Sequence, residues 1–358
     1  MTITNAEIAA RLADRFAMTA NDELVRLYPD EAGGFVDGNF DSWQVGTSFS
    51  ISGQTKTYTA DMWYCDAGFS GVATVSQDTR TLGGEPSGMT RPSKYRLKFQ
   101  QTTSASIESR IGQALESVAQ YNGQSITVSY WLQSDVNMNV VNVNLIQNFG
   151  TGGSPSSTVT TTKAVTWAVT TTEKRFSVRL DVPSISGKTL GTNGNDYLAV
   201  ELRTQTGLTF TLYVDQAQID VCGSAASSDT TGAGGTPQPF RYRGPALEMM
   251  RVLRSLWVFN IPAFGAFNTC AIQTTTRGYS TIQYPVTMRK APAIALTSGA
   301  LQITAAGSAF TVTAFSSANV GPLNGIILTD VASGLTVGQA GYIQSGSGGA
   351  VLTFDARL

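Results

Sequence analysis

Aromatic side chains are the residues of this chain best suited to ligand recognition, because the apolar face of an exposed ring can stack on a sugar ring. The candidates are Trp131, Trp63 and Tyr64. Trp131 is the strongest, since alternation along residues 126–133 places it with the polar positions, whereas Tyr130 has the parity of the apolar ones. Trp is highly buried on average, so the alternative is that these rings belong to a core or a subunit interface.

A set of oxygen-bearing side chains suggests a structural calcium ion as a cofactor. Asp37, Asn39 and Asp41 alternate at the start of the β region, and Asp215 lies in a late strand that can run beside the first in a sandwich. Carboxylate and amide oxygens are ligands that Ca²⁺ prefers, although the spacing is not that of an EF-hand loop. The simpler alternative is that these are solvated turn carboxylates.

Paired carboxylates raise the question of glycoside hydrolysis, which needs two carboxyl groups at a defined separation around a cleft. Two such pairs are Asp61 with Asp66 and Glu201 with Asp215. Chance pairs are expected, however, because the chain has 25 acidic residues. The chain has no histidine, which removes the histidine-dependent nucleophilic arrangements and the commonest general base. The Gly-rich residues 345–349 lack a Walker lysine. We therefore expect a protein that is not an enzyme.

Charge and cysteine content narrow the class of partner. The 358 residues carry a net charge of −1 without a Lys/Arg cluster, so we expect no nucleic-acid binding. No apolar stretch is long enough to span a membrane and no signal peptide is visible, so we expect no membrane insertion.

The chain has an odd number of cysteines at irregular separations, Cys65, Cys222 and Cys270. This pattern favours reduced thiols and folding in a cytoplasm.

Short strands must position these candidate residues. Charged residues are only 14% of the chain, a composition typical of strands and turns when Gly, Ser, Thr and Val are abundant. From residue 35 to 222 apolar and polar residues alternate, for example at 95–99 and 126–132. Many short strands with few helices between them predict a mainly β fold that begins with a jelly-roll β-sandwich.

Three further segments complete the predicted organisation. Residues 1–34 form an N-terminal helical segment, and residues 223–240 have almost no apolar bulk and form a linker. Residues 241–358 form a smaller C-terminal β-sandwich, preceded at 246–259 by apolar residues at helical spacing. That stretch predicts a connecting helix whose end could enter a strand.

The C-terminal region is rich in Ala, Gly, Ser and Thr and poor in charge. An isolated monomer would therefore expose weakly protected strand edges and apolar faces. Association with sister chains in closed cyclic symmetry is the usual remedy, so we expect a homo-oligomer.

Several segments resemble bacteriophage tail-fibre and head-fibre proteins. They are residues 147–156 (QNFGTGGSPS), 182–189 (VPSISGKT), 193–198 (NGNDYL), 239–243 (PFRYR), 283–292 (QYPVTMRKAP) and 354–358 (FDARL). The resemblance covers about residues 35–358. It implies a jelly roll like those of carbohydrate-binding modules, in which a structural calcium often lies where the first and last strands meet, followed by a β-domain of the kind found at fibre tips.

The resemblance also implies a biological setting. Such proteins are typically homotrimers in the virion, assembled in the host bacterial cytoplasm, and their N-terminal end, here residues 1–31, commonly attaches to other virion proteins. The expected function is that of a structural fibre or spike subunit that attaches to host-surface glycans. A polysaccharide depolymerase spike is the alternative from another class, although no repeat of fixed period is apparent. A connector or decoration protein without a ligand is the third.

Overall fold

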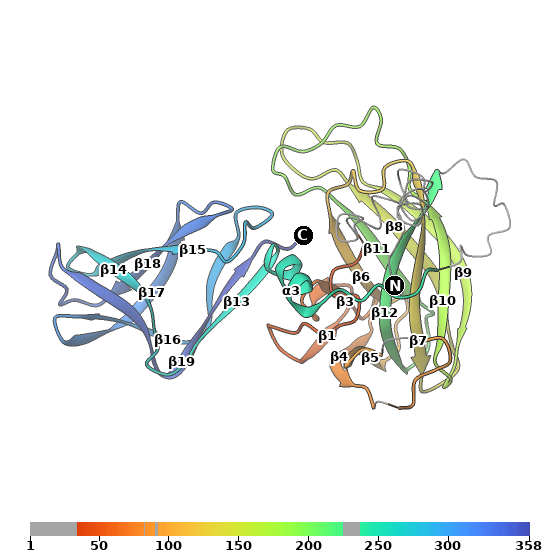
Figure 1. Ribbon diagram of the computed structural model, residues 1–358, viewed down its shortest axis with the longest axis horizontal. Coiled ribbons are helices and arrows are strands. Elements are labelled where there is room, and N and C mark those ends of the chain that lie inside the picture. Colours follow the sequence, from red (N-terminus) through yellow and green to blue (C-terminus); the bar gives the residue numbers. More distant parts are fainter. Residues whose placement is uncertain (1–33, 82, 90–91, 225–236) are drawn as a thin grey trace, which may run out of the picture.

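The computed structural model describes residues 34–81, 83–89, 92–224 and 237–358, with the side chains of 222–224 excepted. The predicted helical segment at 1–31 and most of the predicted linker lie outside these residues. Within them strands dominate and α3 is the single helix, which confirms the mainly β fold (Figure 1). No helix in the described part of the chain is long and apolar enough to cross a membrane.

The N-terminal domain consists of two antiparallel sheets, each with six strands among the described residues. Sheet A has the order β1-β4-β5-β12-β7-β10, with bounds β1 Ser48–Ser52, β4 Val72–Thr79, β5 Tyr95–Thr103, β12 Phe210–Ser224, β7 Gln124–Ser134 and β10 Lys174–Asp181. Sheet B has the order β2-β3-β6-β11-β8-β9, with bounds β2 Thr57–Tyr58, β3 Trp63–Asp66, β6 Arg110–Glu116, β11 Tyr197–Thr204, β8 Met138–Asn148 and β9 Val159–Val169. Consecutive strands repeatedly change sheet, as in a jelly roll.

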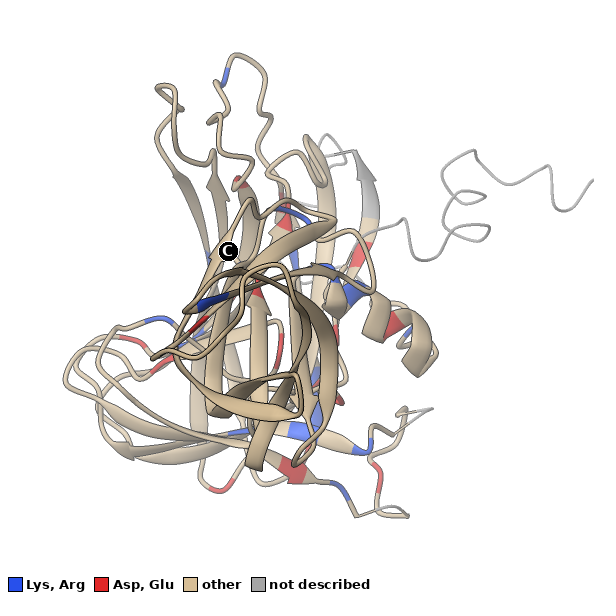
Figure 2. Ribbon diagram, turned by 90° about the vertical axis from the view of Figure 1, so that its left-hand side faces the viewer, with Lys and Arg blue, Asp and Glu red and all other residues tan. Residues whose placement is uncertain are grey.

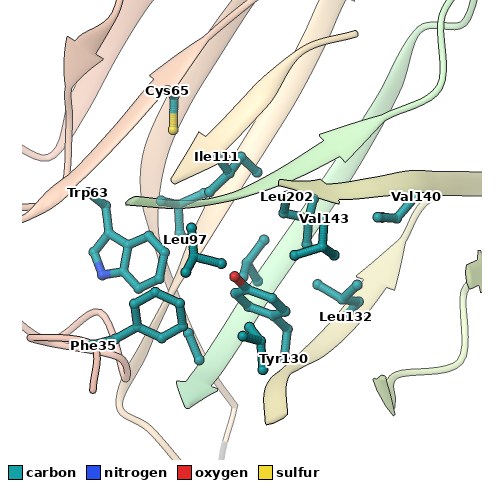
Figure 3. Close-up of a cluster of buried hydrophobic side chains, with 14 of the residues drawn as sticks. Phe35, Trp63, Cys65, Leu97, Ile111, Tyr130, Leu132, Val140, Val143 and Leu202 are labelled. Atoms are coloured by element: carbon teal, nitrogen blue, oxygen red, sulfur yellow. The ribbon is translucent and has the colours of Figure 1, made fainter. Parts of the chain in front are cut away.

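The core lies between the two sheets and is built by the alternation seen in the sequence. Of the predicted inward residues of β5 and β7, Tyr95 is half-buried. The others are fully buried: Leu97, Phe99, Ile126, Val128, Tyr130 and Leu132. Figure 3 shows side chains of sheet A facing Ile111, Val143 and Leu202 of sheet B. Burying one large apolar side chain stabilises a fold by about 1.5–3 kcal/mol, so this layer is the main source of stability.

Part of the outer face of sheet A, along β7 and β12, is also covered, contrary to the sequence prediction that its strands are half buried. Thr127 and Ser129, on the polar side of β7, are fully buried. Arg175 of the neighbouring β10 donates a hydrogen bond from NH2 to Ser129 Oγ (3.0 Å). The segment after β12 also folds back, and the backbone N–H of Gln238 donates to Asp220 Oδ2 (3.0 Å). Polar groups therefore cover the middle strands of this sheet.

A helix and a strand join the two domains. The sequence predicted the helix and left a strand at its end as the alternative. Helix α3 (Pro245–Leu253) begins with Pro245 in its first turn, where the missing N–H costs no intrahelical bond. Glu248 near its start and Arg251 near its end suit the helix dipole. The helix ends before β13 (Leu256–Ile261), so the C-terminal part of the predicted helical stretch is a strand.

The C-terminal domain is a single antiparallel sheet of seven strands among the described residues. After β13 come β14 Ala266–Thr274, β15 Arg277–Gln283, β16 Ala293–Ala305, β17 Ser308–Ala318, β18 Asn324–Val331 and β19 Ala340–Asp355. The first half of β19 pairs with β14 on one side and β16 on the other, so the sheet closes on itself. The two faces of the predicted smaller sandwich are thus parts of one continuous barrel-like sheet.

Closure of this sheet weakens one of the two reasons for expecting an oligomer, namely the exposed strand edges of the C-terminal domain. The free edges that the sequence suggested are largely removed by pairing within the chain, because a closed sheet has no edge. Low charge remains: only five charged residues lie between 256 and 355, and Figure 2 shows few coloured positions on the domain that faces the viewer. The core of this domain contains Leu301, Ile303, Ile327, Ile343, Leu352 and Phe354.

Candidate functional site

Trp131 is not the exposed platform that the sequence predicted. It is 5% exposed, and a Cβ atom on Gly88 would lie 3.9 Å from its Cη2 atom. The connection between β4 and β5 therefore lies beside the indole, so the ring faces away from the core without reaching solvent. Strand parity gave the correct face, but it could not show that a loop lies over that face.

Trp63 and Tyr64 are buried as well. The indole of Trp63 packs between Phe35 and Phe40, with ring centroids 4.8 Å from each, and its Nε1 donates to the backbone oxygen of Asp37 (3.0 Å). Tyr64 lies on the outer face of sheet B, where its hydroxyl donates to Glu201 Oε1 (2.9 Å). The alternative reading, that these rings are structural, is the one that fits their burial.

The Tyr64 ring is covered by a lysine. The ammonium nitrogen of Lys56 lies 4.1 Å from its centroid, a cation–π contact. Burial lowers the pKa of Lys56 to about 8, although Glu201 raises it. Tyr64 therefore offers neither a free face nor a free hydroxyl to a ligand.

The four predicted calcium ligands do not form one site. Asp37, Asn39 and Asp41 share a loop in which Asp37 Oδ1 accepts the backbone N–H of Asp41 (2.9 Å) and Asn39 Nδ2 donates to Asp41 Oδ2 (2.6 Å). This loop does lie beside β12, because the N–H of Ala217 donates to Gly38 O (2.8 Å). The carboxylate of Asp215, however, is bound to Arg80 and Ser93. No group of three or more acidic, Cys or His residues in the described ranges is placed to hold a metal ion.

Asp37 has a structural role in its loop. Its carboxylate is buried and also accepts the backbone N–H of Ser42 (3.1 Å). Burial raises the pKa of Asp37 well above its ordinary value, and the nearby Asp61 adds to the increase. The loop thus closes around its own carboxylate.

The carboxylate pairs considered for hydrolysis are separated or bound to other groups. Asp61 accepts hydrogen bonds from the Ser42 hydroxyl and from Gln44, and Asp66 is paired with Arg110. Glu201 and Asp215 belong to sheets B and A, and each is bound to its own arginine, Arg203 for Glu201 and Arg80 for Asp215. Neither pair faces a shared cleft in the way that a glycosidase requires.

A polar cavity of about 510 Å³ is the stronger candidate site. Its walls come from the end of β4, the connection between β4 and β5, the start of β5, the end of β7 and the connection between β9 and β10. These segments meet because β4 pairs antiparallel with β5, and β7 with β10, so that the end of one strand lies beside the start of its partner. The volume falls within the roughly 300–1,000 Å³ of small-ligand sites.

Arg96 organises one wall of this cavity. It faces Asp78 across the β4–β5 ladder, and its Nε donates to Asp78 Oδ2 (2.6 Å) while NH1 donates to Gln133 Oε1 (2.7 Å). The guanidinium carbon lies 3.9 Å from the centroid of Tyr213, and Gln133 Nε2 donates to the backbone oxygen of Thr171 (2.9 Å). Each planar polar group is therefore held in a fixed orientation before any ligand arrives.

Arg80 organises another wall. Its NH1 and NH2 donate to the two oxygens of Glu173 (2.9 and 2.5 Å), and its Nε and NH2 donate to Asp215 Oδ2 (3.2 and 2.7 Å). Burial lowers the pKa of Arg80, but the hydrogen bonds and charges of the two carboxylates outweigh it and raise the pKa above its usual value. The guanidinium stays charged and fixed.

The cavity therefore presents hydrogen-bond donors and acceptors side by side. Guanidinium and amide N–H groups donate, carboxylate and amide oxygens accept, and hydroxyls of Thr79, Thr81, Thr171 and Thr172 do both. The sequence prediction missed these residues because it searched for aromatic platforms. The sequence feature that could have identified them is a polar side chain at an outward position of an otherwise apolar strand, such as Arg96 between Tyr95 and Leu97.

The segments that carried the resemblance to fibre proteins lie partly together. The loops after β8 and after β10 run side by side, with backbone hydrogen bonds from Gly191 to Phe149 (2.7 Å), from Thr192 to Gly152 (3.2 Å) and from Ser156 to Thr189 (2.9 Å). Together they project from one end of the sandwich (Figure 1). The segment at 239–243 lies elsewhere, where the N–H of Arg241 donates to Gln218 Oε1 (2.7 Å) on β12.

No family model matches this sequence, and neither does any curated protein. Among solved structures, the chain is similar to the CBM22-2 xylan-binding domain of Xyn10C from Paenibacillus barcinonensis, at 16% identity and a TM-score of 0.31, covering 53% of this chain and 97% of that one. It is similar to the C-terminal family 22 carbohydrate-binding module of Xyn10B from Clostridium thermocellum, at 17% identity and a TM-score of 0.32, covering 55% and 99%.

The chain is also similar to the enzymatically active domain of tailspike protein 4 of bacteriophage CBA120, at 10% identity and a TM-score of 0.30. That match covers 52% of this chain but only 20% of the tailspike chain. Because these identities and TM-scores are low, we assign the jelly roll from the order and pairing of the strands in this chain.

Proposed function

We propose that this chain is a non-enzymatic, glycan-binding structural subunit of a virion fibre or spike. The observation that carries the glycan part is the cavity on sheet A, where Arg96, Asp78 and Gln133 are held in place by one another. Sugar hydroxyls donate and accept hydrogen bonds together, and a wall of paired donors and acceptors can satisfy both at once. Preorganised groups lose little entropy when the ligand binds.

The proposal assigns binding and not catalysis to the cavity. Two carboxylates that line it, Asp78 and Glu173, are each bound to an arginine, Arg96 and Arg80. A general acid must be able to reach the glycosidic oxygen, whereas both of these carboxylates are already engaged by guanidinium groups. Incubating the protein with a bound polysaccharide and measuring new reducing ends tests this point; release of reducing ends would support the depolymerase alternative.

A glycan array with the full chain tests the binding proposal. We expect binding to at least one bacterial surface glycan, weakened roughly 3- to 10-fold by Gln133→Ala, because that change removes the amide and releases Arg96. Gln273→Ala is a matched control, since Gln273 is an exposed residue of β14 in the other domain. A protein that binds no glycan would refute the proposal, and equal binding by both variants would move the site elsewhere.

The virion and oligomer parts of the proposal come from the sequence and from the low charge of the C-terminal domain. We propose a homotrimer in which residues 1–31 attach to other virion proteins. The C-terminal domain exposes Phe264, Leu323 and Val337, which sister chains could cover. Light scattering of the full chain tests the oligomer, and a stable monomer at micromolar concentration would overturn it. Deletion of residues 1–31 should leave a folded protein that no longer joins the particle.

A further inference from the structure

We propose that the junction between the two domains binds an oxyanion, such as a carboxylate, sulfate or phosphate group, through Arg289. This site is separate from the cavity on sheet A and does not depend on the function proposed for it. The junction contains a cavity, guanidinium groups predominate in its lining, and one of them, that of Arg289, has no ion pair among the described residues.

A cavity of about 420 Å³ lies between the sandwich and the C-terminal domain. The sandwich contributes Tyr58 and Glu116, the helix and its end contribute Arg251 and Arg254, and the C-terminal domain contributes Arg289 and Arg357. The cavity is large enough for a small anionic ligand such as a single acidic sugar. A ligand in it would touch both domains.

The lining of this cavity is unbalanced in charge. Four arginines line it. Among the described residues, the acidic side chain that faces them is Glu116, and Leu358 adds a main-chain oxygen that accepts a hydrogen bond from Lys56 Nζ (2.7 Å). Three of the arginines have acidic partners: Arg254 with Glu116 (2.5 Å), Arg251 with Glu248 (3.3 Å) and Arg357 with Asp355 (2.7 Å).

Arg289 is the exception. Within the described part of the chain its side chain has no ion pair, and its buried Nε has no hydrogen-bond partner. Burial lowers the pKa of Arg289, and the nearby Glu116 and Asp196 only partly oppose this effect. A partly buried guanidinium without a counter-ion is unfavourable. An oxyanion in the cavity would supply the missing counter-charge.

The chemistry of guanidinium selects the class of ligand. Two parallel N–H groups match the two oxygens of a carboxylate, sulfate or phosphate, so the pair can be bidentate. Ser117 and Gln120 of the sandwich and Ser255 after helix α3 also line the cavity, and their side chains can donate further hydrogen bonds. Neutral sugars lack the charge that Arg289 needs.

Calorimetry and thermal melting of the full chain test the inference at constant ionic strength. The probes are glucuronate, sulfate and phosphate, with glucose and chloride as the neutral and simple-anion controls. We expect glucuronate or an inorganic oxyanion to bind and to raise the melting temperature, because a ligand that binds only the folded state stabilises it. Tighter binding of glucuronate points to an acidic sugar as the source of the oxyanion, and equal binding points to a free anion.

Two variants with opposite expected effects separate a binding role from a structural one. Arg289→Gln should weaken oxyanion binding at least roughly 10-fold, since it removes the one unpaired charge. Glu116→Gln should tighten it, because it removes the competing carboxylate. Arg277→Gln is the matched control, an arginine of β15 paired with Asp330. The inference is overturned if the oxyanion probes bind no more tightly than chloride. It is also overturned if Glu116→Gln leaves the affinity for these probes unchanged. The Glu116→Gln protein keeps the test possible even if Arg289→Gln fails to fold.

Discussion

The guanidinium of Arg80 lies against the fully buried carboxylate of Asp215, 135 residues later in the chain, with NH2 2.7 Å from Oδ2. The same guanidinium binds Glu173. Asp215 Oδ1 accepts the hydroxyl of Ser93 (2.7 Å), so both of its oxygens have partners. This network ties the β4–β5 connection to β12 and supports one wall of the polar cavity.

The buried carboxyl of Asp215 predicts a pH dependence of stability. Burial raises its pKa from 3.8 to about 6, although Ser93 and Arg80 lower it. Between these values the folded state holds a proton that the unfolded state has lost, so this group's contribution to stability falls as pH rises from 4 to 6.

Asp215→Asn should remove that contribution, so the melting temperature of the variant should rise more steeply, or fall less, than that of the wild type between pH 4 and 6. Melting curves of both proteins across this range provide the measurement. Parallel pH profiles would contradict the assignment.

Trp131→Ala should destabilise the sandwich, because the ring is buried beneath the β4–β5 connection. Large-to-small changes at buried aromatic positions cost about 3–5 kcal/mol. Urea unfolding measures the loss, and Gln133→Ala, two residues away and half-buried, should change the free energy of unfolding far less. An unchanged unfolding midpoint for Trp131→Ala would instead indicate an exposed ring.

Tyr130→Phe should stabilise the protein by about 1 kcal/mol. The hydroxyl of Tyr130 is buried in the apolar core without a hydrogen-bond partner, an arrangement that costs about 1–3 kcal/mol. Tyr64→Phe is the control with the opposite sign, since it removes a donor to the buried Glu201. The prediction fails if chemical denaturation shows that both changes destabilise equally.

The ion pair between Arg254 and Glu116 should contribute little to the stability of the domain junction. Its two side chains are 45% and 46% exposed, and exposed pairs contribute about 0–1 kcal/mol. A double-mutant cycle with alanine at both positions measures the coupling directly. A coupling energy well above this range would show that the junction depends on the pair.

The sequence alone determined, for several strands of the sandwich, which side chains point into the core. Alternation at 95–99 and 126–132 correctly identified Leu97, Phe99 and Tyr130 as inward residues, because successive side chains of a strand must point to opposite faces. Apolar residues at helical spacing in 246–259 predicted a connecting helix and left open whether the end of that stretch enters a strand, which it does. Among the cysteines whose side chains the structure describes, Cys65 and Cys270 are free thiols and are buried. The irregular spacing of the cysteines had predicted reduced thiols.

The tertiary structure alone decided what covers the outer faces and which polar groups meet. Trp131 is buried because Gly88 lies beside it, and Asp215 is lost as a metal ligand because Arg80 reaches it. Pairing of β19 on both sides closed the C-terminal sheet. Strand periodicity is a local property fixed by backbone geometry, whereas covering a face or closing a sheet depends on contacts between segments far apart in the chain, which no local pattern records.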